Sequence, residues 1–317
     1  MFSPVVKPTT IRNTLAASHN WVLCQSDMQN AFLHGELQEQ IFMSQPSGFI
    51  HPQYPNHVCK LKKSLYNLKH APHAWYMRLL KFLLTAGFTT SKSDTSLFIY
   101  RAHGVVPYIL LYVDDIIVTG NNSSFLESMI SKLGAEFSIP DLSPLSFFLG
   151  IQASHGSSGI TLSQEQYITS LLKNANMHCY KPLSTPMVVN SKLHVGDSPL
   201  FHDATLYRKE PYNMSLSLVL TLPLSSTKLA CQFMHNPTAF TDTDWAGSLD
   251  DHKSAGGYAS FLGNTLVSWS SKKQRTVARS STKSEYKTLA DVVAELTWIR
   301  SILSELGVHL PKAPILL

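Results

Sequence analysis

The sequence has few cysteines, little charge and no long apolar run, and each shortage excludes a class of protein. Its four cysteines form no C-x-x-C pair and have no histidine at zinc-ligand spacing, which excludes a disulfide scaffold and a zinc module. The longest apolar run, Tyr108 to Val113, is far too short to cross a bilayer. No basic stretch followed by an apolar one opens the chain, so we expect no signal peptide and an intracellular protein without a membrane partner.

The remaining composition is that of an ordinary globular protein with a modest positive charge. The 317 residues are 44% hydrophobic and 15% charged, which is enough for two domains. The formal net charge of +5 fits a phosphate-rich partner, but it carries weight only where the charges cluster. Nothing in the sequence indicates an oligomeric state or a cellular compartment.

Hydrophobic periodicity predicts mixed α/β structure up to about residue 190. We expect short strands at 21–24 and 41–43, a helix at 75–84 ended by Gly87, and helices at 125–137 and 164–175. Residues 190 to 240 are rich in proline and low in complexity, and no element is predicted there. Further on, strands at 258–262 and 265–269 flank a two-residue hairpin signal, and a helix is predicted at 281–306.

The most informative segment is an apolar stretch, residues 108–120, that is interrupted by Asp114 and Asp115. Apolar strands of this kind favour burial in a sheet, where two adjacent carboxylates would be desolvated and repel each other. A divalent cation removes both penalties, and hard oxygen ligands select Mg²⁺ or Mn²⁺. A hairpin turn with two solvated aspartates is the alternative at this point.

A third carboxylate, Asp27, follows a predicted strand far upstream. Nucleotidyl transfer with two metal ions needs carboxylates that converge from separate strands. In such chemistry the protein mainly positions the groups and neutralises charge. Asp27, Asp114 and Asp115 are therefore the candidate catalytic residues and metal ligands, with the solvated turn still open as the alternative for the pair.

Seven motifs in this chain occur in an order that resembles the reverse transcriptase of copia-type retrotransposon Pol polyproteins, with plant-like phrasing. They are QSDMQNAFLHG at 25–35, MSQPSGF at 43–49, VCKLKKSLY at 58–66, APHAWY at 71–76, KSDTSLF at 92–98, LYVDD at 111–115 and FFLGI at 147–151. The resemblance covers nearly all of residues 2–188. It implies an RNA-directed DNA polymerase that uses an RNA template, a DNA primer or hybrid, and deoxynucleoside triphosphates.

The resemblance also implies roles for residues outside the carboxylates. Phe32 matches the aromatic residue that blocks a ribose 2′-hydroxyl, with a core phenylalanine as the alternative. Tyr66, Lys69 and Pro72 lie in the segment that contacts nucleotide and template. The primer grip is matched by Phe148, Leu149 and Gly150.

This chain departs from the family pattern in that same nucleotide-binding segment. Asn67 replaces a glycine, His70 a glutamine and His73 an arginine. Asparagine tolerates a positive φ better than most residues, though less freely than glycine. Loss of the arginine removes a permanent charge and a bidentate phosphate donor, which puts nucleotide and template binding in doubt.

A second region resembles the RNase H domain of the same polyprotein. Asp242 matches its first acidic residue and Glu285 its second, whereas Asp244 reads as structural. A solvated glutamate in a first helical turn is the alternative for Glu285. The two remaining acidic residues are expected beyond the point where the sequence stops, so we expect negligible RNase H activity.

The resemblance predicts an α+β chain in three parts. Residues 1–188 form a reverse-transcriptase palm, an antiparallel sheet with helices on one face, with incomplete fingers. Residues 189–238 are a degenerate connection segment, and residues 239–317 are a partial, truncated RNase H-like α/β unit. We expect that the fingers segment before Phe2 is missing and that a connection segment is deleted between Thr238 and Ala239.

Several functions remain open from the sequence. The first is an active polymerase, and the second is a catalytically inactive retroelement remnant that at most binds nucleic acid. A metal-dependent nuclease fails on the missing acidic residues, and no feature favours a domesticated structural protein. The basic residues that either contact phosphates or are simply solvated are Lys60, Lys62, Lys63, Lys69, Lys272, Lys273 and Arg275.

Overall fold

A computed structural model of the chain describes residues 6–17, 21–28, 30–137, 143–148, 150–156, 159–174, 179, 227–229, 236–310 and 312–317. The chain divides into two compact units. The first unit contains residues 1–11 and 21–145, and the second contains residues 12–20 and 146–317. The first helix of the chain is α1 (Pro8–Ala17).

The first unit is built on a six-stranded sheet in which every pair of neighbours is antiparallel. Its order is β4 (Thr89–Thr90), β5 (Leu97–Ile99), β6 (Pro107–Tyr112), β7 (Asp115–Gly120), β1 (Val22–Asp27) and β8 (Ser143–Pro144). The two apolar strands predicted between residues 108 and 120 are thus β6 and β7. Asp115 is already the first residue of β7, so only Asp114 of the two aspartates lies in the turn.

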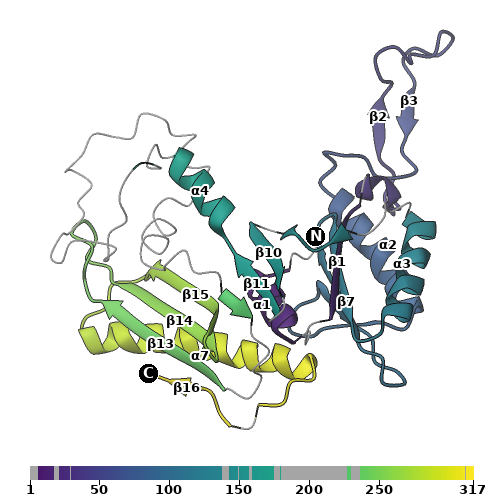
Figure 1. Ribbon diagram of the computed structural model, residues 1–317. Coiled ribbons are helices and arrows are strands. Elements are labelled where there is room, and N and C mark those ends of the chain that lie inside the picture. Colours follow the sequence, from purple (N-terminus) through teal and green to yellow (C-terminus); the bar gives the residue numbers. More distant parts are fainter. Residues whose placement is uncertain are drawn as a thin grey trace. The chain divides into compact units, whose positions relative to one another are not determined.

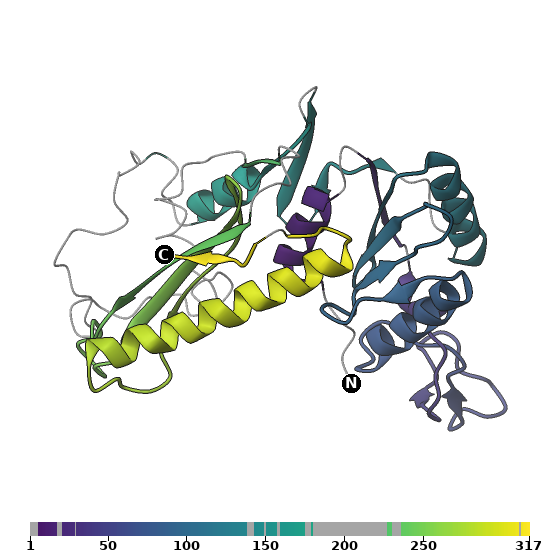
Figure 2. The same cartoon turned by 90° about the horizontal axis from the view of Figure 1, so that it is seen from below.

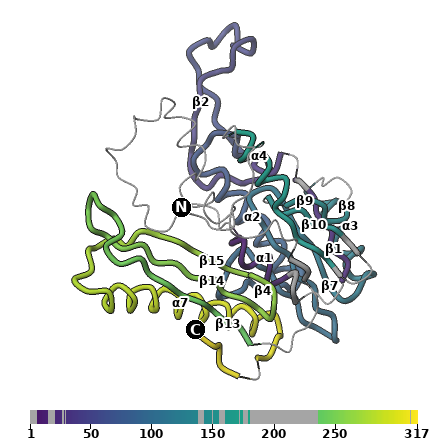
Figure 3. The backbone as a smooth tube through the Cα atoms, turned by 60° about the vertical axis from the view of Figure 1, so that its left-hand side comes forward, coloured from purple at the N-terminus to yellow at the C-terminus, as the bar shows by residue number. Residues whose placement is uncertain are grey.

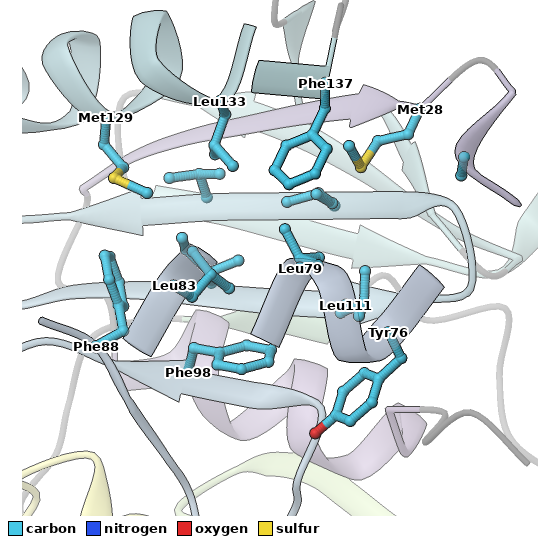
Figure 4. Packing of buried hydrophobic residues seen from close by; sticks show 14 of the residues in the cluster. Met28, Tyr76, Leu79, Leu83, Phe88, Phe98, Leu111, Met129, Leu133 and Phe137 are labelled. Atoms are coloured by element: carbon cyan, nitrogen blue, oxygen red, sulfur yellow. The ribbon is translucent and has the colours of Figure 1, made fainter. Parts of the chain in front are cut away.

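Two helices, α2 (Ala71–Thr85) and α3 (Ser123–Phe137), cover one face of this sheet. Trp75, Leu79 and Leu83 recur at every fourth position of α2 and are fully buried. Figure 4 shows Leu79 and Leu83 of α2, with side chains of α3, packed against the strands. An antiparallel sheet with helices on one face is the arrangement that the sequence predicted for this region.

A hairpin projects from the first unit, as Figures 1 and 3 show. It consists of β2 (Phe42–Ser44) and β3 (Val58–Lys60), which pair only with each other. The chain reaches it from β1 through a short 3₁₀ helix, η1 (Ala31–His34). Of this hairpin, the sequence predicted only the first strand.

The second unit contains two further sheets. One is an antiparallel sheet of β9 (Phe147–Phe148), β10 (Ile151–Gly156), β11 (Gly159–Ser163) and β12 (Thr227–Leu229). The helix α4 (Glu165–Asn174) follows β11 in the chain. The other has the order β15 (Thr265–Lys273), β14 (Ala255–Leu262), β13 (Pro237–Asp244) and β16 (Ile315–Leu316).

The chain of this last sheet runs as a three-stranded antiparallel meander, then a helix, then a strand parallel to β13. The helix is α7 (Ser281–Glu305), whose Val292 and Leu296 pack on Ala239 of β13. Figure 2 shows α7 lying along the sheet. Ser280 caps the helix by accepting a hydrogen bond from the backbone N–H of Lys283. The strands and the helix predicted beyond residue 239 are present: β14 begins earlier and β15 ends later than predicted, and α7 ends one residue earlier.

β13 runs through Thr238 and Ala239, where a deletion was predicted, and its pairing with β14 is unbroken there. Most of the predicted connection, residues 189–238, lies outside the described residues. Within the described ranges, Cys24, Cys59 and Cys179 are unpaired. No helix in those ranges has both the length and the apolar character needed to cross a membrane.

Candidate active site at the end of strands β1 and β7

The first and last aspartates of the predicted triad meet across two neighbouring strands. Asp27 is the last residue of β1, Asp115 is the first residue of β7, and the two are register partners. Residues directly opposite in an antiparallel pair have Cα atoms about 4.5–5.5 Å apart. The backbones of two residues that are far apart in sequence therefore lie opposite each other in the sheet. The side chain of Asp27 lies outside the described set, so its position here is that of its backbone.

The remaining aspartate, Asp114, lies in the two-residue turn between β6 and β7. Its partner in the turn, Val113, has a φ of 58°, in the left-handed region. A β-branched residue is rarely found there, and the conformation costs roughly 1–2 kcal/mol. Two hydrogen bonds hold this turn in place. Trp75 Nε1 donates to the carbonyl of Val113 at 2.9 Å, and the backbone N–H of Met28 donates to the carbonyl of Asp114 at 2.9 Å.

These hydrogen bonds connect the turn to both of its neighbours. Met28 directly follows Asp27, so the end of β1 is tied to the turn that carries Asp114. Trp75 is fully buried in the core beneath α2, so the turn is also tied to that helix. The sequence placed Trp75 in a helix but gave no sign that its indole N–H supports the turn, because that contact spans 38 residues.

The carboxylates stand where a buried sheet meets solvent. Asp114 and Asp115 are half-buried, whereas Leu111 and Ile116, which precede and follow them, are buried. Carboxylate oxygens at such a boundary are the hard donors that Mg²⁺ and Mn²⁺ prefer. Among the described side chains, no three histidine, cysteine, aspartate or glutamate residues are gathered closely enough to hold a metal ion. The evidence for the triad is therefore the register of β1 with β7 and the hydrogen bonds of the turn.

Phe32 and Tyr66, both predicted to lie near the nucleotide, are in contact. Their rings are 5.2 Å apart in an edge-to-face arrangement. Phe32 belongs to η1, and its carbonyl accepts a hydrogen bond from the hydroxyl of Ser64. Asn67 follows with a φ of 68°, the left-handed conformation that a glycine at this position would adopt freely. Asparagine is among the residues that tolerate this conformation.

The other predicted nucleotide contacts lie around the start of α2. Lys69 is exposed just before the helix, and Pro72 is in its first turn, where a missing N–H has no cost. His70 and His73 line a cavity of about 910 Å³ on the outer side of α2. His73 Nδ1 is buried and has no hydrogen-bond partner among the described residues. The histidine that replaces an arginine thus faces this cavity.

Charged residues border the same cavity. Arg78 of α2 pairs with Glu36 and, at 2.7 Å, with Glu136 at the end of α3. Nearby, the ring of His34 lies 6.1 Å from that of Trp75 and 5.9 Å from that of Phe137. Burial, reinforced by the positive charges of Lys63 and Arg78, lowers the pKa of His34.

The two acidic residues of the second region lie on adjoining elements of the second unit. Asp242 is exposed on β13 and accepts a hydrogen bond from the N–H of Thr243 at 2.7 Å. Thr243 in turn donates to the hydroxyl of Thr288 at 2.7 Å, which fastens this end of β13 to the early turns of α7. Glu285 is exposed in those turns. Asp244 packs against Gly247, where an added Cβ would meet its carboxylate at 1.6 Å, as suits a structural residue.

The predicted primer grip is described in part. Phe148 is buried in β9, and Gly150 has a φ of 75° and lies beside the ring of Tyr167. Leu149 lies outside the described residues. All three positions belong to the second unit, so the structure describes them apart from the aspartates.

Comparison with known proteins gives consistent matches. Residues 1–189 match the family model described as reverse transcriptase (RNA-dependent DNA polymerase). The chain is 41% identical to the Retrovirus-related Pol polyprotein from transposon RE1 of Arabidopsis thaliana, over 99% of this chain and 24% of that protein. It is 33% identical to the corresponding polyprotein from transposon TNT 1-94 of Nicotiana tabacum, over 98% of this chain and 27% of that protein. The chain thus spans about a quarter of these relatives.

Proposed function

Because this chain belongs to the reverse transcriptase (RNA-dependent DNA polymerase) family, we propose that its first unit is the polymerase core of a copia-type Pol polyprotein. Its reaction is the template-directed addition of deoxynucleotides to a primer. The observation that carries the proposal is the register of Asp27 with Asp115, combined with the Met28–Asp114 hydrogen bond. Together they bring the backbones of three carboxylate residues to one end of the sheet.

The three carboxylates fit divalent cations by their chemistry. We assign Asp27, Asp114 and Asp115 as the residues that would hold them. When bound, such ions supply charge neutralisation to the triphosphate and polarise the primer's 3′ hydroxyl. The protein contributes position. The β6–β7 hairpin carries Asp114 and Asp115, and the end of β1 carries Asp27, so groups positioned in advance would need little reorganisation during the reaction.

The ring pair of Phe32 and Tyr66 suits the selection of the sugar. We propose that Phe32 occupies the space that a ribose 2′-hydroxyl would need, with Tyr66 holding the ring by its edge-to-face contact. Lys69 and Pro72 would lie along the nucleotide and template. Phe148, Leu149 and Gly150 are proposed as the primer grip, and this role follows from the sequence motif.

We propose that the last sheet and α7 form an RNase H-like unit with Asp242 and Glu285 as the matched acidic residues. The order of three antiparallel strands, a helix and a parallel strand supports this assignment. The Thr243–Thr288 hydrogen bond supports the proximity of the elements that carry the two acids. No nuclease activity is assigned to two carboxylates.

The second candidate function is an inactive remnant that at most binds nucleic acid. Two observations favour it. The alignment with the RE1 polyprotein extends over 352 residues although this chain has 317, so that relative has internal residues without a counterpart here. In addition, His73 stands where the family motif has an arginine and faces a cavity instead of offering a permanent charge.

Primer extension on an RNA template with Mg²⁺ and deoxynucleotides separates the two functions. If the chain is a polymerase, the full chain should extend the primer. Asp114→Asn should lower the extension rate by at least about 100-fold, as for removal of one essential electrostatic group. Glu127→Gln, on the exposed side of α3, is the matched control and should extend primers like the parent. Absence of extension by the parent favours the remnant, and equal extension by Asp114→Asn rejects the assigned site.

A further inference from the structure

The projecting hairpin, residues 41–61, exposes an unusual amount of apolar surface. We call it the arm. Five of its large apolar side chains are between 51% and 82% exposed, which are Phe42, Phe49, Ile50, Tyr54 and Val58. Scattered exposed apolar residues are normal, but a concentration on one protruding element marks a surface that binds something.

The tip of the arm is nevertheless well organised. The Gln45 side chain accepts a hydrogen bond from the N–H of His51 at 2.6 Å and donates to the carbonyls of Tyr54 and His57, both at 2.8 Å. The ring of Tyr54 stacks on that of His57 at 4.7 Å with an interplanar angle of 20°, and it lies 5.2 Å from the ring of His51. A surface arranged in advance loses less entropy when it binds a partner.

The arm itself carries charge of a single sign, and the nearest acidic residues in sequence are Glu36, which forms a β-bridge with Lys63, and Glu39. Residues 40–93 contain no aspartate or glutamate, and they carry seven lysines and arginines. Lys60, Lys62 and Lys63 are exposed at the base of the arm, and no carboxylate within the described ranges lies at ion-pair distance from them. A second copy of this surface would bring like charges together, whereas a polyanion complements it.

The root of the arm adjoins the candidate active site. The N–H of Ser64 donates to the carbonyl of Gly35 at 3.0 Å, just after η1. A Cβ added to Gly35 would lie 2.6 Å from Ser64 Oγ and 2.9 Å from the backbone nitrogen of Trp75, so the root, η1 and α2 meet closely. Trp75 is the residue that supports the turn bearing Asp114.

We propose that the arm is a binding platform for single-stranded nucleic acid, and that its ligand is the unpaired part of the template, which rests on the proposed polymerase function. Bases stack on the exposed rings of the tip, chiefly Phe49 and Tyr54. The phosphates contact Lys60, Lys62 and Lys63. Exposed rings next to exposed lysines are the combination that binds single strands with little sequence preference. A duplex offers its phosphates but not its base faces.

Fluorescence anisotropy tests this with the full chain and a labelled oligothymidylate of roughly 20 nucleotides, longer than common single-strand sites. The competitor probe is a blunt duplex of equal length. Replacement of both Phe49 and Tyr54 by alanine should weaken single-strand binding at least about tenfold, as expected for the loss of base stacking. The same variant should change duplex binding less than twofold. Leu84→Ala, which removes an exposed apolar side chain from α2, is the control and should leave both affinities unchanged.

Two further variants separate the parts of the platform. Gln45→Ala keeps every ring but removes the hydrogen bonds of the tip, and it should weaken single-strand binding. Lys62→Gln with Lys63→Gln should weaken binding of both probes and flatten its salt dependence by about one unit of slope per lost phosphate contact. Unchanged unfolding temperatures of the variants exclude loss of the fold as the cause.

The outcomes are distinct from those of primer extension. The binding measurement needs no divalent cation, nucleotide or turnover, so it can fail while polymerisation succeeds, and the reverse. Single-strand affinity unchanged in the Phe49 and Tyr54 variant overturns the platform. If sedimentation instead shows that this variant loses an oligomeric state and keeps its oligonucleotide affinity, the arm is a protein interface and the proposal is wrong.

Discussion

Asp27 and Asp115 are register partners across the antiparallel strands β1 and β7, although 88 positions separate them in the sequence. The pairing makes the backbones of the two residues neighbours, and this arrangement depends on the register of the whole strand pair. Any change that shifts β1 by one residue would turn the Asp27 side chain to the opposite face. The chemistry proposed for this chain therefore depends on strand register as much as on the carboxylates.

Metal binding should follow the three aspartates. Asp27→Asn and Asp114→Asn should each weaken Mn²⁺ binding by about tenfold or more, since affinity for hard cations depends on the charge of the ligands. Titration of free Mn²⁺ by electron paramagnetic resonance measures this without any turnover. Glu127→Gln should bind Mn²⁺ like the parent. A triad variant with the parent's affinity would show that the ion binds elsewhere.

Trp75→Phe should damage the active site more than its stability loss implies. It leaves the part-buried carbonyl of Val113 without this donor, which costs up to about 1–3 kcal/mol, the range for a fully buried acceptor. The turn then loses its support from α2, and displacement of Asp114 by about 1 Å can cost up to about 100-fold in rate. Primer extension and chemical denaturation measure the two effects.

Tyr76→Phe is the matched control for that experiment. The Tyr76 hydroxyl donates to the carbonyl of Thr95 at 3.0 Å, from the same helix and the same core but away from the turn. Its loss should cost about 1 kcal/mol of stability and leave primer extension close to the parent's. Equal losses of extension in both variants would show that Trp75 acts only through stability.

Phe32→Ala should relax the choice of sugar. Removal of the ring opens the space assigned to a 2′-hydroxyl, so incorporation of ribonucleotides should rise by at least about tenfold relative to deoxynucleotides, a difference of roughly 1.4 kcal/mol in discrimination. Primer extension with each nucleotide class in separate reactions gives the ratio. Tyr66→Ala should shift the ratio in the same direction but less, because Tyr66 is proposed to act on the sugar through its contact with Phe32. An unchanged ratio in Phe32→Ala would show that Phe32 is only a packing residue of the core.

The second unit should tolerate alanine at Gly257 but not at Gly256. A Cβ at Gly256 would meet Thr288 Oγ1 at 2.2 Å, whereas at Gly257 its nearest neighbour is a backbone oxygen at 3.4 Å. Gly256→Ala should lower the free energy of unfolding of this unit by about 1–3 kcal/mol through overpacking against α7. Thr288→Ala removes the obstructing atoms, so the double variant should lose less than the sum of the single losses.

Stability should fall below neutral pH partly through His34. Burial and the nearby positive charges lower its pKa in the folded chain, so the unfolded chain binds the proton more readily. As pH falls below the ordinary histidine value of about 6.5, unfolding is therefore favoured, until the folded state also takes up the proton. Thermal melts at several pH values should show a shallower dependence in His34→Gln. His309→Gln, which removes an exposed histidine of the second unit, controls for the loss of one imidazole.

The sequence predicted the elements better than their pairing. The apolar spacing of Trp75, Leu79 and Leu83 was enough to predict α2, because helical periodicity is a local signal. The strand partners Phe42–Ser44 and Val58–Lys60 were missed in part, since an exposed hairpin carries no alternation of apolar and polar residues. The two-residue strand β16 was missed for the same kind of reason, because it exists only through its pairing with β13.

At the candidate site, too, the sequence identified residues but not the contacts between them. The motifs identified Asp27, Asp114 and Asp115 as residues, and the structure adds the strand register that relates them. The support of the turn by Trp75 and Met28 could not be predicted, because a hydrogen bond to a backbone carbonyl leaves no trace in residue type. The Asn67 backbone is an exception, since a residue that tolerates positive φ signals the conformation directly.

Val113 stores conformational energy next to the carboxylates. Asparagine or glycine at this position would remove the backbone strain, and the turn between β6 and β7 could then adopt other conformations at lower cost. A branched side chain keeps the left-handed conformation only because the surrounding hydrogen bonds impose it. The chain thus gives up a little folding stability in the turn that carries Asp114.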